Sequence, residues 1–455
     1  MSQYAVSLFI FRRDLRLDDN TGLNEALKLS GQVLPCFIFD PAQIEPHSYQ
    51  SKPGLQFMLQ SLSDLQQQLQ SVGGCLALYR QTPELVIRQA VAEHNIQAVF
   101  INRDYTTFSR RRDYALQILC AELGIALHCL PDALLTEPEQ ALKSDQTPYK
   151  VFTAFYNNAR QFHVPLPRPL PSHNFLNITS SYSDPVAAVP LTINPSIMKG
   201  GRQQALQGLE RLDRYVDYQH QRDFPAQDAT SKLSAHLKFG TCSVREAFYA
   251  ITTQLGSEHP LLRQLYWRDF FSHIAYHFPQ VFGRAFVEKF ANVYWDNNPD
   301  YFQAWREGKT GFPIVDAGMR ELNATGYMHN RLRMIVASFL VKDCHINWRW
   351  GERYFAQHLV DYDPCVNNGN WQWAASTGCD AQPYFRIFNP WLQQQKFDPD
   401  CQYITRWLPE LAGISAKKIH QWNKQQLACD YPAPMLDHSR ESQIAKQRFK
   451  QAAEQ

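Results

Sequence analysis

Ala5-Val-Ser-Leu-Phe-Ile-Phe11 is a short, almost wholly apolar run near the amino terminus, and such a run is typical of a buried strand. Similar runs recur at Val33–Phe39, Cys75–Tyr79, Ala98–Ile101 and Ala126–Leu130. Amphipathic stretches that predict helices lie among them, at Gln56–Val72, Pro83–His94 and Ser109–Leu123. This alternation predicts an open α/β domain with a parallel sheet and right-handed crossovers. No glycine-rich phosphate loop follows any of the runs, so the sheet shows no evident nucleotide site.

The remaining chain divides into a connector and a helical part. Residues 131–200 are rich in Pro, Ser and Asn, which is typical of a connector that crosses the surface. Helical patterns dominate from residue 201, and all ten tryptophans lie between Trp267 and Trp422. We therefore predict an α/β domain over residues 1–130, a connector over 131–200 and an all-helical domain over 201–455.

Composition excludes several classes of protein. The net charge of +2 identifies no partner, because a nearly neutral protein can still carry a local basic groove. The ten cysteines are dispersed without a Cys-x-x-Cys pair, so neither a disulfide framework nor a metal site is indicated. No apolar run reaches membrane-spanning length and no signal-like amino terminus is present. We expect a cytoplasmic protein without a metal.

Two segments of the helical part have the chemistry of a binding site. Thr230-Ser-Lys-Leu-Ser234 places hydroxyls and a cation at the start of a predicted helix, which suits a pyrophosphate, although an ordinary N-cap explains it equally simply. Gln264, Trp267 and Arg268 share one helical face. A flat indole beside an amide suits a stacked base, but a tryptophan buried in the core is the competing interpretation.

Polar residues gather in two further segments. Asn330, Arg333 and Met334 share a helical face, and Arg331 is turned away from it. Residues 361–373 contain two acids, four amides, a glycine and two tryptophans, and buried amides need hydrogen-bond partners. Trp371 and Trp373 point to different sides of a helix, so one of them is placed to serve a buried cofactor while the other faces a cavity.

These segments resemble the photolyase and cryptochrome family, and most closely its bacterial-type enzymes that act on cyclobutane pyrimidine dimers. The opening Phe11-Arg-Arg-Asp-Leu-Arg-Leu-Asp-Asp-Asn20 matches that of the family. The strongest matches are residues 308–317, 326–334 and 367–380, which occur in the family's order. The resemblance extends over essentially the whole chain.

The resemblance implies an amino-terminal antenna domain and a helical domain that binds a folded FAD. Asp361 is expected to pair with Arg333 and, with Asp363, to contact the polar edge of the flavin, while Asn367 faces flavin N5. Trp371, Trp348 and Trp295 match the family's electron relay from the surface. The full set of expected FAD ligands is Tyr218, Thr230, Ser231, Lys232, Leu233, Ser234, Arg333, Asp361, Tyr362, Asp363 and Asn367.

The expected reaction is the light-driven splitting of the dimer by an electron from reduced FAD. The dimer must first leave the duplex and enter a cavity, whose walls are expected to be Trp267 and Trp373. The expected partner is therefore damaged DNA, bound by a monomer. The residues that match the family's contacts to the lesion or its phosphates are Arg222, Gln264, Trp267, Asn330, Arg331, Met334 and Trp373.

Two departures from the family pattern leave alternatives open. Gln264 stands where enzymes that split cyclobutane dimers usually carry glutamate, and glutamine occurs there in (6-4) photolyases and animal cryptochromes. Against (6-4) repair, His329 is followed by Asn330 rather than by a second histidine. Phe108 and Ser109 replace the Asn-Glu pair that holds a folate antenna, so folate, a deazaflavin or no antenna all stay open. A cryptochrome-like light sensor is the competing function, although the lack of a long carboxy-terminal extension disfavours it.

Overall fold

The computed structural model describes residues 2–178, 184–189, 191–380, 386–424 and 429–454. The chain divides into two compact units. The first consists of Met1–Val216 with Ser231–His277, and the second of Asp217–Thr230 with Phe278–Gln455. Residues 201–216 and 231–277, predicted to belong to the helical domain, thus pack in the unit that contains the sheet.

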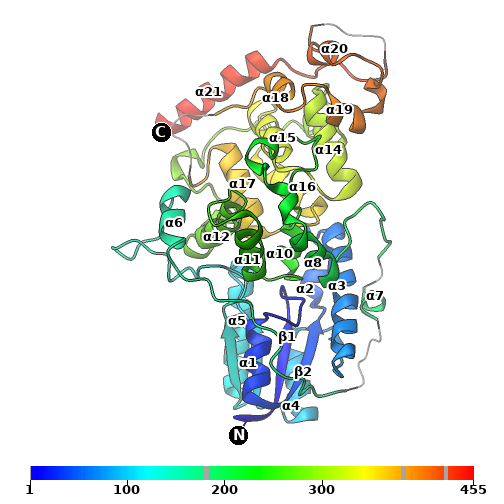
Figure 1. Ribbon diagram of the computed structural model, residues 1–455. Coiled ribbons are helices and arrows are strands. Elements are labelled where there is room, and N and C mark those ends of the chain that lie inside the picture. Colours follow the sequence, from blue (N-terminus) through cyan, green and yellow to red (C-terminus); the bar gives the residue numbers. More distant parts are fainter. Residues whose placement is uncertain (1, 179–183, 190, 381–385, 425–428, 455) are drawn as a thin grey trace. The chain divides into compact units, whose positions relative to one another are not determined.

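The first unit is built on a five-stranded parallel sheet (Figure 1). Its strands are β1 (Tyr4–Phe11), β2 (Ser30–Ile38), β3 (Ala77–Tyr79), β4 (Ala98–Asn102) and β5 (Ala126–Leu130), in the order β3-β2-β1-β4-β5. The predicted parallel α/β sheet is confirmed. From β1 the chain adds β2 and then β3 on one side. It then returns to the other side of β1 to add β4 and β5, so the direction of strand addition reverses between β1 and β4.

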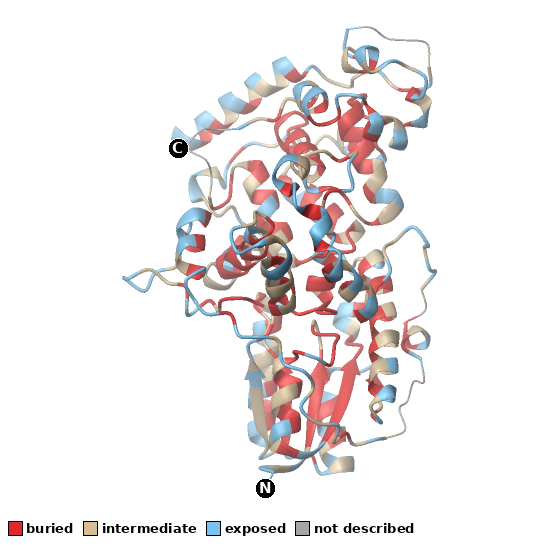
Figure 2. Ribbon diagram, viewed as in Figure 1, coloured by how far each residue is buried: buried red, intermediate tan, exposed pale blue. Residues whose placement is uncertain are grey.

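Helices cover both faces of the sheet because side chains alternate along each strand. Leu8 and Ile10 of β1 pack in one core with α4 (Pro83–His94) and α5 (Thr107–Glu122). On the opposite face, α1 (Thr21–Leu29) approaches the Phe9 ring so closely that a Cβ at Gly22 would lie 3.0 Å from it. The central strands are correspondingly buried (Figure 2).

The other helices of the first unit continue along the chain. Ser243 and Glu246 form a capping box at the start of α11 (Val244–Leu255). These elements are α2 (Pro41–Ile44), α3 (Lys52–Ser71), α6 (Phe152–Ala159), α7 (Pro185–Ala188), α8 (Arg202–Glu210), η1 (Leu212–Tyr215), α10 (Ser234–Phe239), α11 (Val244–Leu255) and α12 (Leu262–His277).

The second unit is helical in the part of the chain that the structure describes. Its core centres on the fully buried Trp305, with Trp348 and Trp371 among the other buried members. Its elements are α9 (Tyr218–Gln221), η2 (Pro279–Val281), η3 (Glu288–Phe290), α13 (Pro299–Glu307), α14 (Pro313–Thr325), α15 (Asn330–Lys342), α16 (Trp348–His358), α17 (Pro364–Ala375), α18 (Pro390–Phe397), α19 (Gln402–Trp407), η4 (Pro409–Leu411), α20 (Ala416–His420) and α21 (His438–Glu454). Among the described residues, no helix has the length and apolar character needed to cross a membrane.

Candidate functional site

An ion pair between Arg333 of α15 and Asp361, in the loop after α16, lies at the centre of the predicted flavin site of the second unit. Arg333 Nη2 donates to Asp361 Oδ2 at 2.9 Å, and Arg333 Nε donates to the Met328 carbonyl at 2.8 Å. Burial alone would lower the pKa of Arg333, but the Asp361 carboxylate more than offsets this and the pKa is raised. The predicted pairing of Asp361 with Arg333 is present.

Asp361 has one oxygen that the protein does not satisfy. Its Oδ1 is buried and has no hydrogen-bond partner among the described residues. A buried carboxylate oxygen without a partner is costly, because it has lost its water and gained no donor. A ligand N–H group would supply the missing donor, so this position fits the polar edge of a flavin ring.

Asn367 lies on the first turns of α17 and is oriented by α16. Its Nδ2 donates to the backbone carbonyl of Glu352 at 3.0 Å and to Glu352 Oε1 at 3.1 Å. Because these contacts occupy the amide nitrogen, Oδ1 is the atom left to face a ligand. Trp371 follows one helical turn later, so it lies on the same side of α17 as Asn367.

Asp363 begins α17 as its N-cap. Its Oδ1 accepts hydrogen bonds from the backbone N–H groups of Cys365 at 2.9 Å and Val366 at 3.0 Å. The Asp363 carboxylate therefore caps α17, and any contact that it makes with a flavin is in addition to this structural role. Tyr362 lies between the two acids and packs against the core of the unit.

In segment 230–234, only the last residue is helical, so most of the segment precedes the helix that was predicted to begin there. Helix α10 begins only at Ser234, Leu233 is its N-cap without a side-chain hydrogen bond, and Lys232 has a left-handed backbone with φ of 52°. Ser231 to Ser234 belong to the first unit and Thr230 to the second. Ser and Thr favour loops as well as caps, since their hydroxyls bond to nearby backbone groups in both. Thr230 lies with its Oγ1 at 3.4 Å from the Tyr327 hydroxyl.

Arg222 and Arg331, the predicted phosphate contacts of the second unit, both interact with neighbouring side chains. The Arg222 guanidinium lies 5.7 Å from the centroid of the Tyr218 ring, and burial raises the pKa of Tyr218. Arg331 Nη2 lies 2.8 Å from Asp223 Oδ1, and its guanidinium is 4.3 Å from the centroid of the Phe397 ring. Arg331 is therefore fixed in place by a carboxylate that a DNA phosphate would have to displace or accompany.

Three more predicted lesion contacts belong to the second unit. Asn330 Nδ2 lies 3.9 Å from Met334 Sδ, so these two side chains share a face of α15 as predicted. Trp373 is half-buried and tilts against Phe388 with ring centroids 6.5 Å apart.

Trp267 and Gln264 lie on α12 in the first unit. The Trp267 ring stacks on Phe152 of α6, with centroids 3.6 Å apart and an interplanar angle of 7°. Gln264 is partly exposed three residues earlier. Arg268 points into its own unit, where Nη1 donates to the Ala133 carbonyl at 2.6 Å. Its Nη2 donates to the Leu237 carbonyl of α10 at 3.4 Å, so two backbone carbonyls hold this guanidinium within the unit.

The predicted relay tryptophans lie in one hydrophobic cluster. Trp371 and Trp348 are buried in it, and the partly exposed Trp295 packs against it. Trp348 is the first residue of α16, which Asn347 caps. Trp295 meets Phe449 of α21 edge-on with centroids 6.1 Å apart. The gradient of burial runs from Trp371 to Trp295, as a route from the interior toward solvent requires.

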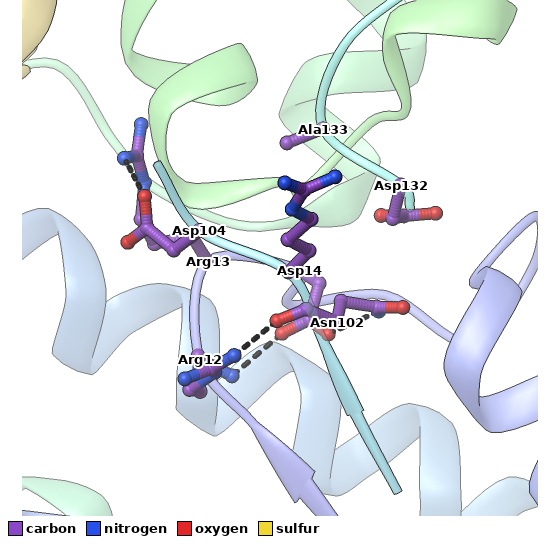
Figure 3. A pocket seen from close by; sticks show the side chains of 8 residues that line it. Arg12, Arg13, Asp14, Asn102, Asp104, Asp132 and Ala133 are labelled. Carbon is purple, nitrogen blue, oxygen red and sulfur yellow. Dashed lines mark hydrogen bonds and ion pairs between the residues drawn. The ribbon is translucent and has the colours of Figure 1, made fainter. Parts of the chain in front are cut away.

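The first unit has a small cavity where the strand order reverses, at the carboxyl ends of β1 and β4 (Figure 3). Such a switch point is the usual ligand position in an open α/β sheet. The cavity has a volume of about 20 Å³, room for about one water molecule. Its side chains bond to one another, with Asn102 Nδ2 donating to Asp14 at 2.5 Å and Arg13 paired with Asp104 at 3.2 Å. This cavity does not hold a second chromophore as it stands.

Sequence reasoning missed two residues of the second unit. Glu352 orients Asn367 from a neighbouring helix, and no spacing rule connects two residues that meet only through helix packing. Tyr327, whose pKa burial raises to about 12, lies beneath the Arg333 guanidinium at 5.7 Å from its ring centroid. Tyr327 could have been found from the sequence, because it lies within residues 326–334, one of the segments that match the family most strongly.

Comparisons with known proteins find similarity to photolyases in both the amino-terminal and the carboxy-terminal part of the chain. A family model described as DNA photolyase matches residues 7–172, and one described as FAD binding domain of DNA photolyase matches residues 261–451. A deoxyribodipyrimidine photo-lyase of Alkalihalophilus pseudofirmus is 38% identical over 471 residues, covering 97% of this chain and 97% of the relative.

Solved structures of photolyases and cryptochromes also have a similar fold. An archaeal photolyase from Sulfolobus tokodaii, determined with two FAD molecules that implicate a novel light-harvesting cofactor, has a TM-score of 0.89 and 42% identity, covering 98% of this chain and 100% of that one. A cryptochrome from Synechocystis sp. PCC6803 has a TM-score of 0.89 and 30% identity, covering 98% and 99%.

Proposed function

Because this chain belongs to the photolyase and cryptochrome family, we propose that it is a carbon–carbon lyase that uses blue light to split cyclobutane pyrimidine dimers in DNA. The observation that carries the proposal is Asp361, which Arg333 holds through one oxygen and whose other oxygen has no partner among the residues that the structure describes. Asp361 lies three residues before the start of α17, the helix that carries Asn367 and Trp371, so a flavin site and an electron donor occur in the same unit.

FAD is the cofactor, and in its reduced form it supplies an electron that opens the cyclobutane ring under light and then takes the electron back. The protein contributes position and electrostatics. We assign Arg333 and Asp361 to the polar edge of the flavin, Asn367 to its N5, and Tyr362 and Asp363 to flanking contacts. The phosphates and ribityl chain are assigned to Tyr218 and Thr230, with Ser231, Lys232, Leu233 and Ser234 retained from the family pattern.

For the DNA, the assignment follows the chemistry of each side chain. Arg222 and Arg331 neutralise phosphates beside the lesion. Trp373 is assigned to the flipped dimer, whose weakened stacking eases extrusion from the duplex, and Trp267 is retained as a lesion contact from the family pattern. Asn330, Met334 and Gln264 complete the set of lesion contacts. The enzyme is proposed to act as a cytoplasmic monomer.

Lesion choice depends on Gln264. Its amide accepts from a pyrimidine N3–H and donates to a carbonyl, so it can recognise a cyclobutane dimer. Repair of (6-4) lesions needs acid–base chemistry, for which the family uses a histidine pair, and this chain has His329 followed by Asn330. A second candidate function is light sensing, favoured by the likeness to the Synechocystis cryptochrome.

The test uses chemically reduced protein with two oligonucleotides, one with a single cyclobutane dimer and one with a single (6-4) lesion. Blue light should restore thymine monomers in the first and leave the second unchanged. A light sensor restores neither, and a (6-4) enzyme restores only the second. Photoreduction of FAD does not separate these functions, because photolyases and cryptochromes both undergo it.

A further inference from the structure

A second row of aromatic rings leaves Trp371 and reaches the surface of the second unit. The Trp305 ring meets Trp371 edge-on, with centroids 6.2 Å apart. Phe302 stacks on Trp305 with centroids 5.8 Å apart and an interplanar angle of 16°. Trp350 then meets Phe302 edge-on at 5.1 Å. The rings are therefore in continuous contact from Trp371 to Trp350.

Local structure explains how this row forms. Phe302 and Trp305 are three residues apart on α13, so their side chains lie on the same face of the helix and stack. Trp350 is on the first turn of α16, and 36% of it is exposed, whereas Trp371 is 2% exposed. The row thus connects a buried indole to a solvated one.

The surroundings of each indole favour outward movement of a positive charge. Trp305 is completely buried, and its indole N–H donates to the Val336 carbonyl at 3.0 Å. A radical cation at Trp305 has little water around it, which makes charge there costly, whereas one at Trp350 is hydrated. A cation lies beside each route, with the Arg349 guanidinium 5.7 Å from the Trp348 ring and the Arg306 guanidinium 5.6 Å from the Phe302 ring, so the difference in burial sets the outward direction.

We propose that Trp350 is a second surface electron donor to Trp371, with Trp305 as the buried intermediate and Phe302 as the ring between them. The inference rests on the proposed function, because it needs photoreduction of bound FAD. Trp371 gives one electron to photoexcited oxidised FAD, Trp305 refills Trp371, and Trp350 refills Trp305 across Phe302. A thiol in solution then reduces the Trp350 radical cation by one electron and releases a proton.

Phenylalanine substitutions test the two routes, since phenylalanine keeps an aromatic ring but removes the easily oxidised indole. Trp348→Phe should retain part of the photoreduction rate with thiol present, and Trp348→Phe/Trp350→Phe should lose what remains. Trp407→Phe on α19 is the control and should match wild type. FAD content and thermal unfolding verify that each variant is folded; the exposed position of Trp350 makes its own substitution mild.

A second readout does not depend on the rate. Illumination with a nitroso spin trap, followed by peptide mass spectrometry, locates the radicals, and an adduct on Trp350 that disappears in Trp305→Phe is expected. An adduct on Trp295 alone, with Trp348→Phe already inactive in photoreduction, overturns the second route and leaves the proposed enzyme intact. Absence of any tryptophan adduct in wild type overturns both routes. Failure of dimer repair with a Trp350 adduct present contradicts only the proposed function.

Discussion

The Asn367 amide donates to both the carbonyl and the carboxylate of Glu352, at 3.0 and 3.1 Å, so one buried acid on α16 sets which amide atom α17 presents to a ligand. The spacing of the two residues does not reveal this contact, because it arises only where α16 and α17 pack together.

Glu352→Ala should destabilise the protein by about 1–3 kcal/mol, because it removes a hydrogen-bond partner from a buried amide nitrogen. Glu352→Gln should cost less, since its side-chain oxygen can still accept from Asn367 Nδ2. Urea unfolding of both variants without added FAD measures the difference. Equal losses in the two variants would show that the hydrogen bond does not hold Asn367.

Asp361→Asn should lower the amount of FAD that co-purifies with the protein. The change removes the negative charge paired with Arg333, whose side chain is 26% exposed, and it alters the carboxylate whose Oδ1 has no partner in the described part of the chain. The FAD-to-protein ratio from absorbance measures this. Asp223→Asn is a matched control, since it breaks another arginine–aspartate pair in the same unit and should leave FAD content unchanged.

Arg331→Ala should weaken binding to dimer-containing DNA and reduce the log–log salt slope by about one unit or somewhat less. Asp223→Asn should act in the opposite direction and tighten binding at low salt, because it removes the carboxylate that competes with phosphate for Arg331. Titrations at several salt concentrations give both slopes. Arg349→Ala removes the same charge from an exposed position on α16, and a slope change equal to that of Arg331→Ala would contradict the specific role of Arg331.

Asp269 should make folding stability depend on pH. Burial raises its pKa to about 7 in the folded state, from 3.8, although Oδ2 accepts from the backbone N–H groups of Leu135 and Thr136. The folded state therefore binds the proton more tightly than the unfolded state. The contribution of Asp269 is fully present below about pH 4 and is lost as the pH rises through about 7. The free energy of unfolding of Asp269→Asn, measured relative to wild type, should therefore increase from pH 5 to about pH 7 and level off between pH 7 and pH 8. A constant difference would exclude this titration.

The sheet could be predicted because its buried strands are apolar runs of strand length, as at Ala98–Asn102, where each residue is buried. The beginning of α10 could not, since Thr230 and Ser231 carry hydroxyls that suit a loop as well as a cap. The pairing of Asp361 with Arg333 was implied by family resemblance rather than by spacing. Contacts such as Trp305 with Trp371 depend on how α13 packs in the core, and no local pattern encodes them.

The most direct test illuminates the reduced protein with blue light on a single cyclobutane dimer and, separately, on a (6-4) lesion, with Gln264→Glu as the companion variant. We expect wild type to restore monomers from the dimer alone. The variant should bind the dimer more tightly or repair it in higher yield, because a charged acceptor contributes about 1.5–3 kcal/mol to a hydrogen bond against about 1 for a neutral one. Repair of only the (6-4) lesion by wild type, with loss of that activity in Gln264→Glu, would contradict the assignment.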